Sequence, residues 1–69
     1  STINVYVASN AANAQTFIQN VANASNSDSG IALDSSTGLL YIDLDSNGVV
    51  DSVIELSGVT TIDAAAFTF

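Results

Sequence analysis

Residues 39–56 read LLYIDLDSNGVVDSVIEL, and the order of residue types in this stretch decides the fold. Two runs rich in aliphatic and aromatic residues, 39–42 and 52–56, flank a segment in which polar types dominate. Such runs are typical of strands, and a polar segment containing Asn-Gly is typical of the connection in a hairpin. The stretch therefore predicts a strand, a loop over 43–51 and a second strand.

The loop over 43–51 carries side-chain oxygens at alternate positions. Asp43, Asp45 and Asn47 occupy positions 1, 3 and 5, Gly48 occupies position 6 and Asp51 occupies position 9. This order matches the D-x-[DN]-x-[DN]-G pattern, in which the glycine takes a backbone conformation that other residues resist. Oxygen-only ligands on a flexible loop favour Ca²⁺ over Mg²⁺. The predicted Ca²⁺ ligands are Asp43, Asp45, Asn47, the backbone carbonyl of Val49, and Asp51.

Two alternatives to this interpretation differ in how well they fit the loop. An EF-hand closes with a glutamate at position 12 on an exiting helix, whereas position 12 here is Ile54 and the following run is strand-like. A polar turn without a metal is the other alternative, because Asp, Ser, Asn and Gly are common turn residues. Such a turn needs only two or three of these residues, so the strand–loop–strand metal site is favoured.

The remainder of the chain predicts one helix and further short strands. Residues 3–7 alternate as in a strand, and Ser9 or Asn10 can cap a helix over about 10–24 with an apolar stripe. Residues 31–33 predict another short strand, and residues 67–69 place two aromatics on one strand face. The expected fold class is α+β, mostly β: a small sheet with a strand–calcium loop–strand hairpin and one covering helix. The stripe on that helix is made of Ala14, Phe17, Ile18, Val21 and Ala24.

Composition limits both the size and the partners of the protein. Its 69 residues make one small domain over 1–69, or a piece of a larger chain. The chain holds seven carboxylates and no Lys, Arg, His or Cys, so its net charge is −7. A chain without basic residues has no footprint for nucleic acid, and no apolar run is long enough for membrane insertion. The usual bases and activated nucleophiles are also absent, so we do not expect an enzyme.

A further succession of motifs runs through residues 37–69. Thr37-Gly38-Leu39-Leu40-Tyr41 precedes the loop, and Leu56-Ser57-Gly58 and Ala64-Ala65-Ala66-Phe67 follow it. This succession resembles the C-terminal tails of RTX-type proteins, including bacterial S-layer proteins and adhesins exported by type I secretion. The glycine-rich nonapeptide repeats of that family are absent. The resemblance implies a bacterial extracellular or cell-surface location, Ca²⁺ dependence, and a C-terminus ending in Phe67-Thr68-Phe69 that the type I secretion machinery reads.

Together these observations predict an extracellular Ca²⁺-binding structural or assembly module, S-layer-like or adhesin-like. Its expected partners are calcium ions, other copies of itself or a cell-surface assembly, and the secretion machinery. The alternative is a self-assembling filament subunit joined by terminal β-strands, residues 3–7 and 67–69. The four acidic residues outside the loop supply either a second ion site or, as the favoured interpretation, solvated surface: Asp28, Asp34, Glu55 and Asp63.

Overall fold

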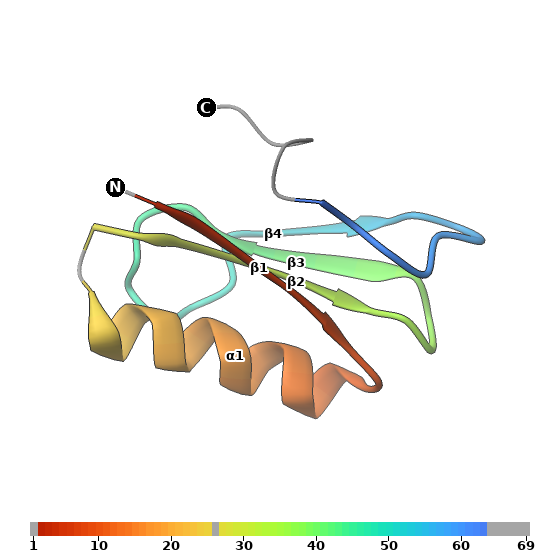
Figure 1. Cartoon of the computed structure of the whole chain (residues 1–69), viewed down its shortest axis with the longest axis horizontal. Helices are drawn as coiled ribbons and strands as arrows, with labels where there is room; N and C mark the ends of the chain where they lie inside the picture. The colour runs from red at the N-terminus through yellow and green to blue at the C-terminus, as the bar shows by residue number, and fades with distance from the viewer. Residues whose placement is uncertain (1, 26, 64–69) are drawn as a thin grey trace.

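One helix packs against a four-stranded sheet in the computed structural model, which describes residues 2–25 and 27–63. The elements follow the order β1 (Ile3–Ala8), α1 (Ala11–Ala24), β2 (Ser29–Asp34), β3 (Leu39–Asp43) and β4 (Ser52–Glu55). The strands lie in the sheet in the order β1-β2-β3-β4, and α1 covers one face of the sheet (Figure 1). The predicted α+β, mostly β fold with one covering helix is confirmed.

The sheet is mixed, because its three connections are of two kinds. β1 and β2 run parallel and are joined through α1, whereas β2, β3 and β4 are antiparallel neighbours. The predicted hairpin over 39–56 is present as β3 and β4, joined by residues 44–51. Parallel neighbours need a long crossover and antiparallel neighbours need only a loop, as observed here.

Helix α1 begins after Asn10, whose side-chain oxygen accepts a hydrogen bond from the Asn13 N–H at 2.8 Å. This is the capping role expected of asparagine, so the predicted start of the helix is correct to within one residue. Of the predicted apolar stripe, Ala14 and Ile18 are buried, while Ala24 at the last turn is exposed.

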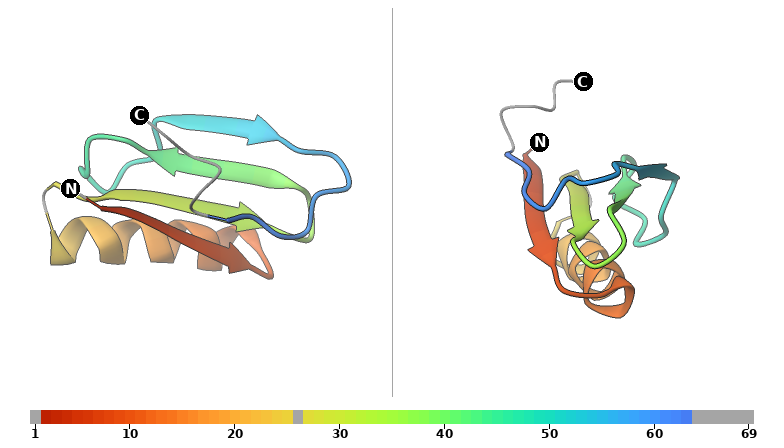
Figure 2. Two further views of the ribbon diagram at one scale, coloured as in Figure 1. Left: turned by 45° about the horizontal axis from the view of Figure 1, so that its top comes forward. Right: turned by 90° about the vertical axis from the view of Figure 1, so that its right-hand side faces the viewer.

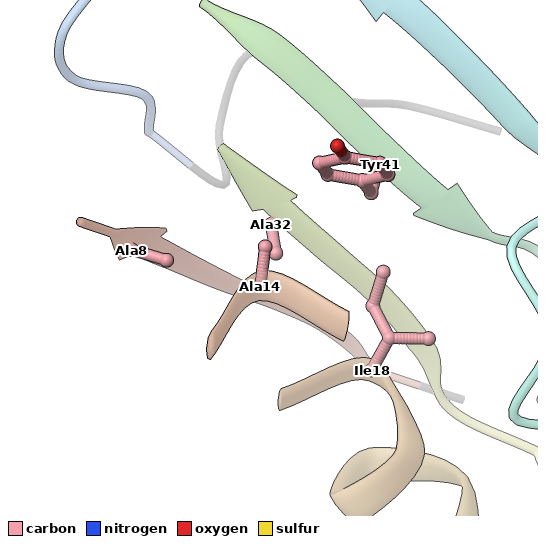
Figure 3. Packing of buried hydrophobic residues seen from close by; sticks show 5 residues of the cluster. All are labelled: Ala8, Ala14, Ile18, Ala32 and Tyr41. Carbon is pink, nitrogen blue, oxygen red and sulfur yellow. The ribbon is translucent and has the colours of Figure 1, made fainter. Parts of the chain in front are cut away.

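The core on the helix side of the sheet is built from small residues around two large ones. Figure 3 shows Ile18 and Ala14 of α1 directed toward the sheet, where Tyr41 lies on β3. A close approach of helix and sheet is possible because Gly30 of β2 has no side chain: a Cβ there would lie 3.4 Å from the Cα of Ile18. The buried members of this cluster are Ala8, Ala14, Ile18, Ala32 and Tyr41.

A second core lies on the opposite face of the sheet. Ile31, Leu33 and Leu40 are buried there, under the chain that leaves β4. Leu56, Val59 and Ile62 of that chain pack on this face, which Figure 2 shows as the blue segment crossing the sheet. Both faces of the central strand are therefore covered.

This double coverage explains why β2 is longer than the strand predicted over 31–33. All six of its residues, Ser29–Asp34, are buried, so the strand lacks the alternation of polar and apolar residues by which half-buried strands are recognised. The predicted strand over 67–69 lies outside the described residues.

Candidate metal site

The acidic loop, residues 43–51, begins at the end of β3 and leads into β4. Asp43 is the last residue of β3 and is only 1 % exposed, whereas Asp45 and Asp51 are exposed. One carboxylate oxygen from each of these three residues lies within 4.8 Å of the other two. The loop thus brings together three of the predicted ligands in a group that could hold a metal ion.

Backbone hydrogen bonds to the loop's own side chains fix its conformation. The Gly48 N–H donates to Asp43 Oδ2 at 3.0 Å, and the Leu44 N–H donates to Asp51 Oδ2 at 2.8 Å. The Asp51 N–H donates to the carbonyl of Ile42 at 2.7 Å, which closes the loop at its base. The carboxylates at the two ends of the loop are therefore held in place by backbone donors.

A hydrogen bond that was not predicted joins Asn47 to Val49. The Val49 N–H donates to Asn47 Oδ1 at 2.9 Å, so this amide oxygen braces the tip of the loop. Such a bond from a side chain to the backbone two residues later is typical of an Asx turn. The ligand roles of Asn47 and of the Val49 carbonyl remain predictions.

The backbone of the loop takes left-handed conformations at two positions. Gly48 has φ of +80°, as the motif requires, and Ser46 has φ of +58°. The Ser46 hydroxyl donates to the carbonyl of Ser25 at 2.5 Å, directly after the end of α1. This bond joins the acidic loop to the helix, and no feature of the local sequence indicated it because the two residues meet only in the folded chain.

One oxygen of the cluster has no partner within the described part of the chain. Asp43 Oδ1 is buried and accepts no hydrogen bond, although Oδ2 of the same carboxylate does. A buried polar atom without a partner costs free energy, and buried polar atoms in native proteins are rarely left so. A bound cation would satisfy this oxygen.

The negative charges of the cluster also favour a bound cation. Partial loss of hydration raises the pKa of Asp45 above its ordinary value of 3.8, and the neighbouring carboxylates of Asp43 and Asp51 raise it further. The sequence contains no Lys, Arg or His to balance these charges. A cation that balanced these charges would therefore have to come from solution.

The acidic residues outside the loop differ from one another in their surroundings. Asp34 is 1 % exposed and its oxygens accept hydrogen bonds from Ser36 and Thr37, so the expectation of solvated surface is wrong at this position. Asp28 accepts a hydrogen bond from the Thr2 N–H at 2.9 Å, and Glu55 is exposed on β4. Asp34 acts as a cap of the turn between β2 and β3.

A hollow of about 450 Å³ lies beside the acidic loop. Its walls come from α1, from β3 and β4, and from the second half of the loop. The lining is uncharged and consists of Gln15, Gln19, Tyr41, Gly48, Val49, Val50 and Val53. The hollow therefore separates α1 from β4 on this side of the helix.

Comparison of the chain with protein-family models, with curated proteins and with solved structures found no match. Over the ranges 2–25 and 27–63, no helix has the length and apolar character needed to cross a bilayer.

Proposed function

We propose that this chain is an extracellular Ca²⁺-binding structural or assembly module of a bacterial cell-surface protein, S-layer-like or adhesin-like. The observation that carries the proposal is the buried, unpartnered Oδ1 of Asp43 in a group with the carboxylates of Asp45 and Asp51. Asn47 and the carbonyl of Val49 complete the proposed ligand set. The role of the ion is to neutralise repulsion within the loop and thereby to hold β3 and β4 together.

Ca²⁺ suits this site better than other common cations. The available donors are oxygens, which excludes the soft metals that prefer sulfur or imidazole. The carboxylates sit on a loop and two of the three are exposed, so the shell is flexible. Mg²⁺ demands a near-ideal octahedron and retains its waters, whereas Ca²⁺ accepts larger and less regular shells.

The proposed extracellular location agrees with the affinity expected of such a site. Loops in extracellular modules bind Ca²⁺ with Kd values of about 10⁻⁴–10⁻³ M, so they fill where Ca²⁺ is millimolar. Binding at 1 mM Ca²⁺ then stabilises the fold by about 0.4–1.4 kcal/mol. The resemblance of residues 37–69 to the tails of type I-secreted proteins supports the same location, with the chain filling its site only after export.

Calorimetric titration with Ca²⁺, paired with thermal unfolding followed by circular dichroism, tests the proposal. We expect saturable binding and a rise in Tm of about 2–10 °C at millimolar Ca²⁺. Asp45→Asn should weaken Ca²⁺ binding by more than about tenfold, because even outer-shell changes at metal sites have effects of that size. It should also raise the Tm of the metal-free protein, since it removes one of three mutually repelling carboxylates.

Glu55→Gln is the matched control for this experiment. It removes the same charge from an exposed position on β4, where Glu55 pairs with Leu39 at the end of the hairpin away from the acidic loop. Calcium affinity should be unchanged in this variant. Equal loss of affinity in the two variants, or an equal response to Mg²⁺, would show that Ca²⁺ acts on net charge and that no site exists.

A further inference from the structure

The sheet has two open edges. β1 and β4 are the outer strands, and within residues 2–25 and 27–63 no other strand pairs with their outer sides. Figure 2 shows these strands at opposite margins of the sheet. Natural proteins usually protect such edges with lysine, proline or a bulge, and this chain contains no Lys and no Pro.

Four of the six exposed large apolar side chains among the described residues lie on these same two strands, and the other two, Leu44 and Val49, lie in the acidic loop. Tyr6 and Val7 of β1 are 44 % and 38 % exposed, and Val53 and Ile54 of β4 are 52 % and 46 % exposed. Each edge thus presents two adjacent apolar residues, which in a strand point to opposite faces of the sheet. Both edges are nearly free of charge, since Glu55 is the only ionisable carboxylate on either strand.

The strand register shows that these four residues end two continuous rows across the sheet. Tyr6 lies beside Ala32, Ala32 beside Tyr41, and Tyr41 beside Val53. In the adjacent row Val7 lies beside Leu33, Leu33 beside Leu40, and Leu40 beside Ile54. The first row belongs to the core under α1 and the second to the core on the opposite face. Each buried core row therefore runs out to an exposed apolar residue at both edges.

The helix side of the sheet differs from one edge to the other. Helix α1 contacts β1, β2 and β3 but not β4, so the sheet overhangs the helix on the β4 side. The hollow lined by Gln15, Gln19 and Val53 lies beneath this overhang. On the β1 side, the Tyr6 ring stacks on Phe17 of the helix with centroids 5.0 Å apart, and the two rings line a separate hollow with Asn13, Thr16 and Asn20.

We infer that the partner of these edges is a second copy of this chain. The β1 strand of this copy pairs with β4 of the first copy, and the two copies keep the same orientation. Both rows then continue from copy to copy: Val53 meets Tyr6 of the next molecule on the helix face, and Ile54 meets Val7 on the other. The stacked rings of Tyr6 and Phe17 then lie beside the neighbour's Val53 and the hollow that Val53 lines. Because the joint uses two different surfaces, it is heterologous, and it extends into open rows when the rotation between copies does not close a ring.

A symmetric joint fits the same surfaces less well. Pairing β4 with β4 of a second copy would place two hollows against each other and leave the Val53 side chains over empty space. This inference deepens the assembly role in the proposed function, but it rests on the sheet edges and not on the acidic loop. The joint and the metal site can accordingly be tested separately.

Cysteine cross-linking between different copies tests the joint, because the chain has no cysteine of its own. Tyr6→Cys and Val53→Cys are made as separate single variants of the full chain and mixed under oxidising conditions. We expect a mixed dimer that exceeds the homodimer of either variant. A short bis-maleimide cross-linker is used in a second reaction. It still links the two introduced cysteines if the strand register between the copies shifts by one residue pair.

The matched control mixes Tyr6→Cys with Ile54→Cys, whose side chains point to opposite faces and should not link. Sedimentation velocity of the unmodified chain should show association that grows with concentration and that weakens in a Val53→Thr, Ile54→Thr variant. A chain that stays monomeric at millimolar concentration, or cysteine homodimers that equal the mixed product, would overturn the inference. Calorimetric Ca²⁺ binding measured on the same variants separates failure of the joint from failure of the metal site.

Discussion

Asp34 and Asp43 are equally buried carboxylates with opposite surroundings. Each is 1 % exposed, and each ends a strand. Asp34 Oδ1 accepts from the N–H and the hydroxyl of Ser36, and Oδ2 accepts from the Thr37 hydroxyl. Asp43 Oδ1 has no such partner among the residues described. One carboxylate is satisfied by its own turn, and the other keeps one oxygen without a partner among the residues described.

Asp34 should make the stability of the fold depend on acid. Hydrogen bonds from Ser36, together with those from Thr37, lower the pKa of Asp34 below its ordinary value of 3.8, although burial opposes them. A lowered pKa in the folded state means that the carboxylate stabilises the protein above pH 3.8 and loses this effect as the pH falls through the folded value. Asp34→Asn should therefore be less stable than the unmodified chain at neutral pH, and this difference should shrink in acid.

Urea unfolding at pH values from neutral to about 2, with Glu55→Gln as a charge-matched control, measures this difference. The raised pKa of Asp45 has the opposite sign, because protonating Asp45 relieves repulsion, so its effect on stability is lost as the pH rises. Comparing Asp34→Asn with the unmodified chain cancels that contribution. A difference between the two proteins that does not change with pH would show that the Asp34 charge has no part in stabilising the turn.

At the scale of elements, the segment after β4 is positioned by a contact at the turn between β2 and β3. Gly38 has φ of +79°, and a Cβ there would lie 2.7 Å from the carbonyl oxygen of Leu56. The Leu56 N–H in turn donates to the carbonyl of Gly38 at 2.7 Å. The contact lies at the start of residues 56–62, whose Leu56, Val59 and Ile62 cover the second core.

Gly38→Ala and Gly58→Ala form a matched pair that tests this contact. Gly58 has φ of +80°, and a Cβ there would meet nothing within 4 Å. Both substitutions carry the cost of a left-handed residue, about 1–2 kcal/mol. Only Gly38→Ala adds a collision with backbone, so it should lower the free energy of unfolding by clearly more, as measured by urea unfolding. Equal losses would mean that the contact with Leu56 contributes nothing.

The elements that could be predicted from the sequence are those whose signals are local. The spacing of Asp43, Asp45 and Asp51 predicted the loop, and an asparagine before an apolar stripe predicted the helix. The bond from Ser46 to Ser25 and the cover of the second core by Val59 and Ile62 join residues far apart in the chain. The edges of the sheet were predicted only in part: residues 3–7 were expected at an edge and form the edge strand β1, whereas the edge position of β4 was not predicted. Such relations depend on strand order, which local patterns do not specify.

At the scale of the whole molecule, the dominant feature is a net charge of −7 with no internal cation. Repulsion among exposed carboxylates weakens as salt rises, since the Debye length falls from about 10 Å at 0.1 M to about 3 Å at 1 M. NaCl should therefore raise the Tm of the metal-free protein. A bound Ca²⁺ ion removes the strongest part of this repulsion, because three of the carboxylates lie within 4.8 Å of one another.

Thermal unfolding in NaCl and in CaCl₂ at matched ionic strength separates screening from binding. Millimolar Ca²⁺ should raise the Tm by about 2–10 °C more than NaCl does, and with Ca²⁺ present the remaining dependence on NaCl should be smaller. Asp45→Asn should keep the response to NaCl and lose most of the additional response to Ca²⁺. If the two salts gave the same Tm at every ionic strength, the acidic loop would be only one more source of negative charge, and its stabilisation would come from screening alone.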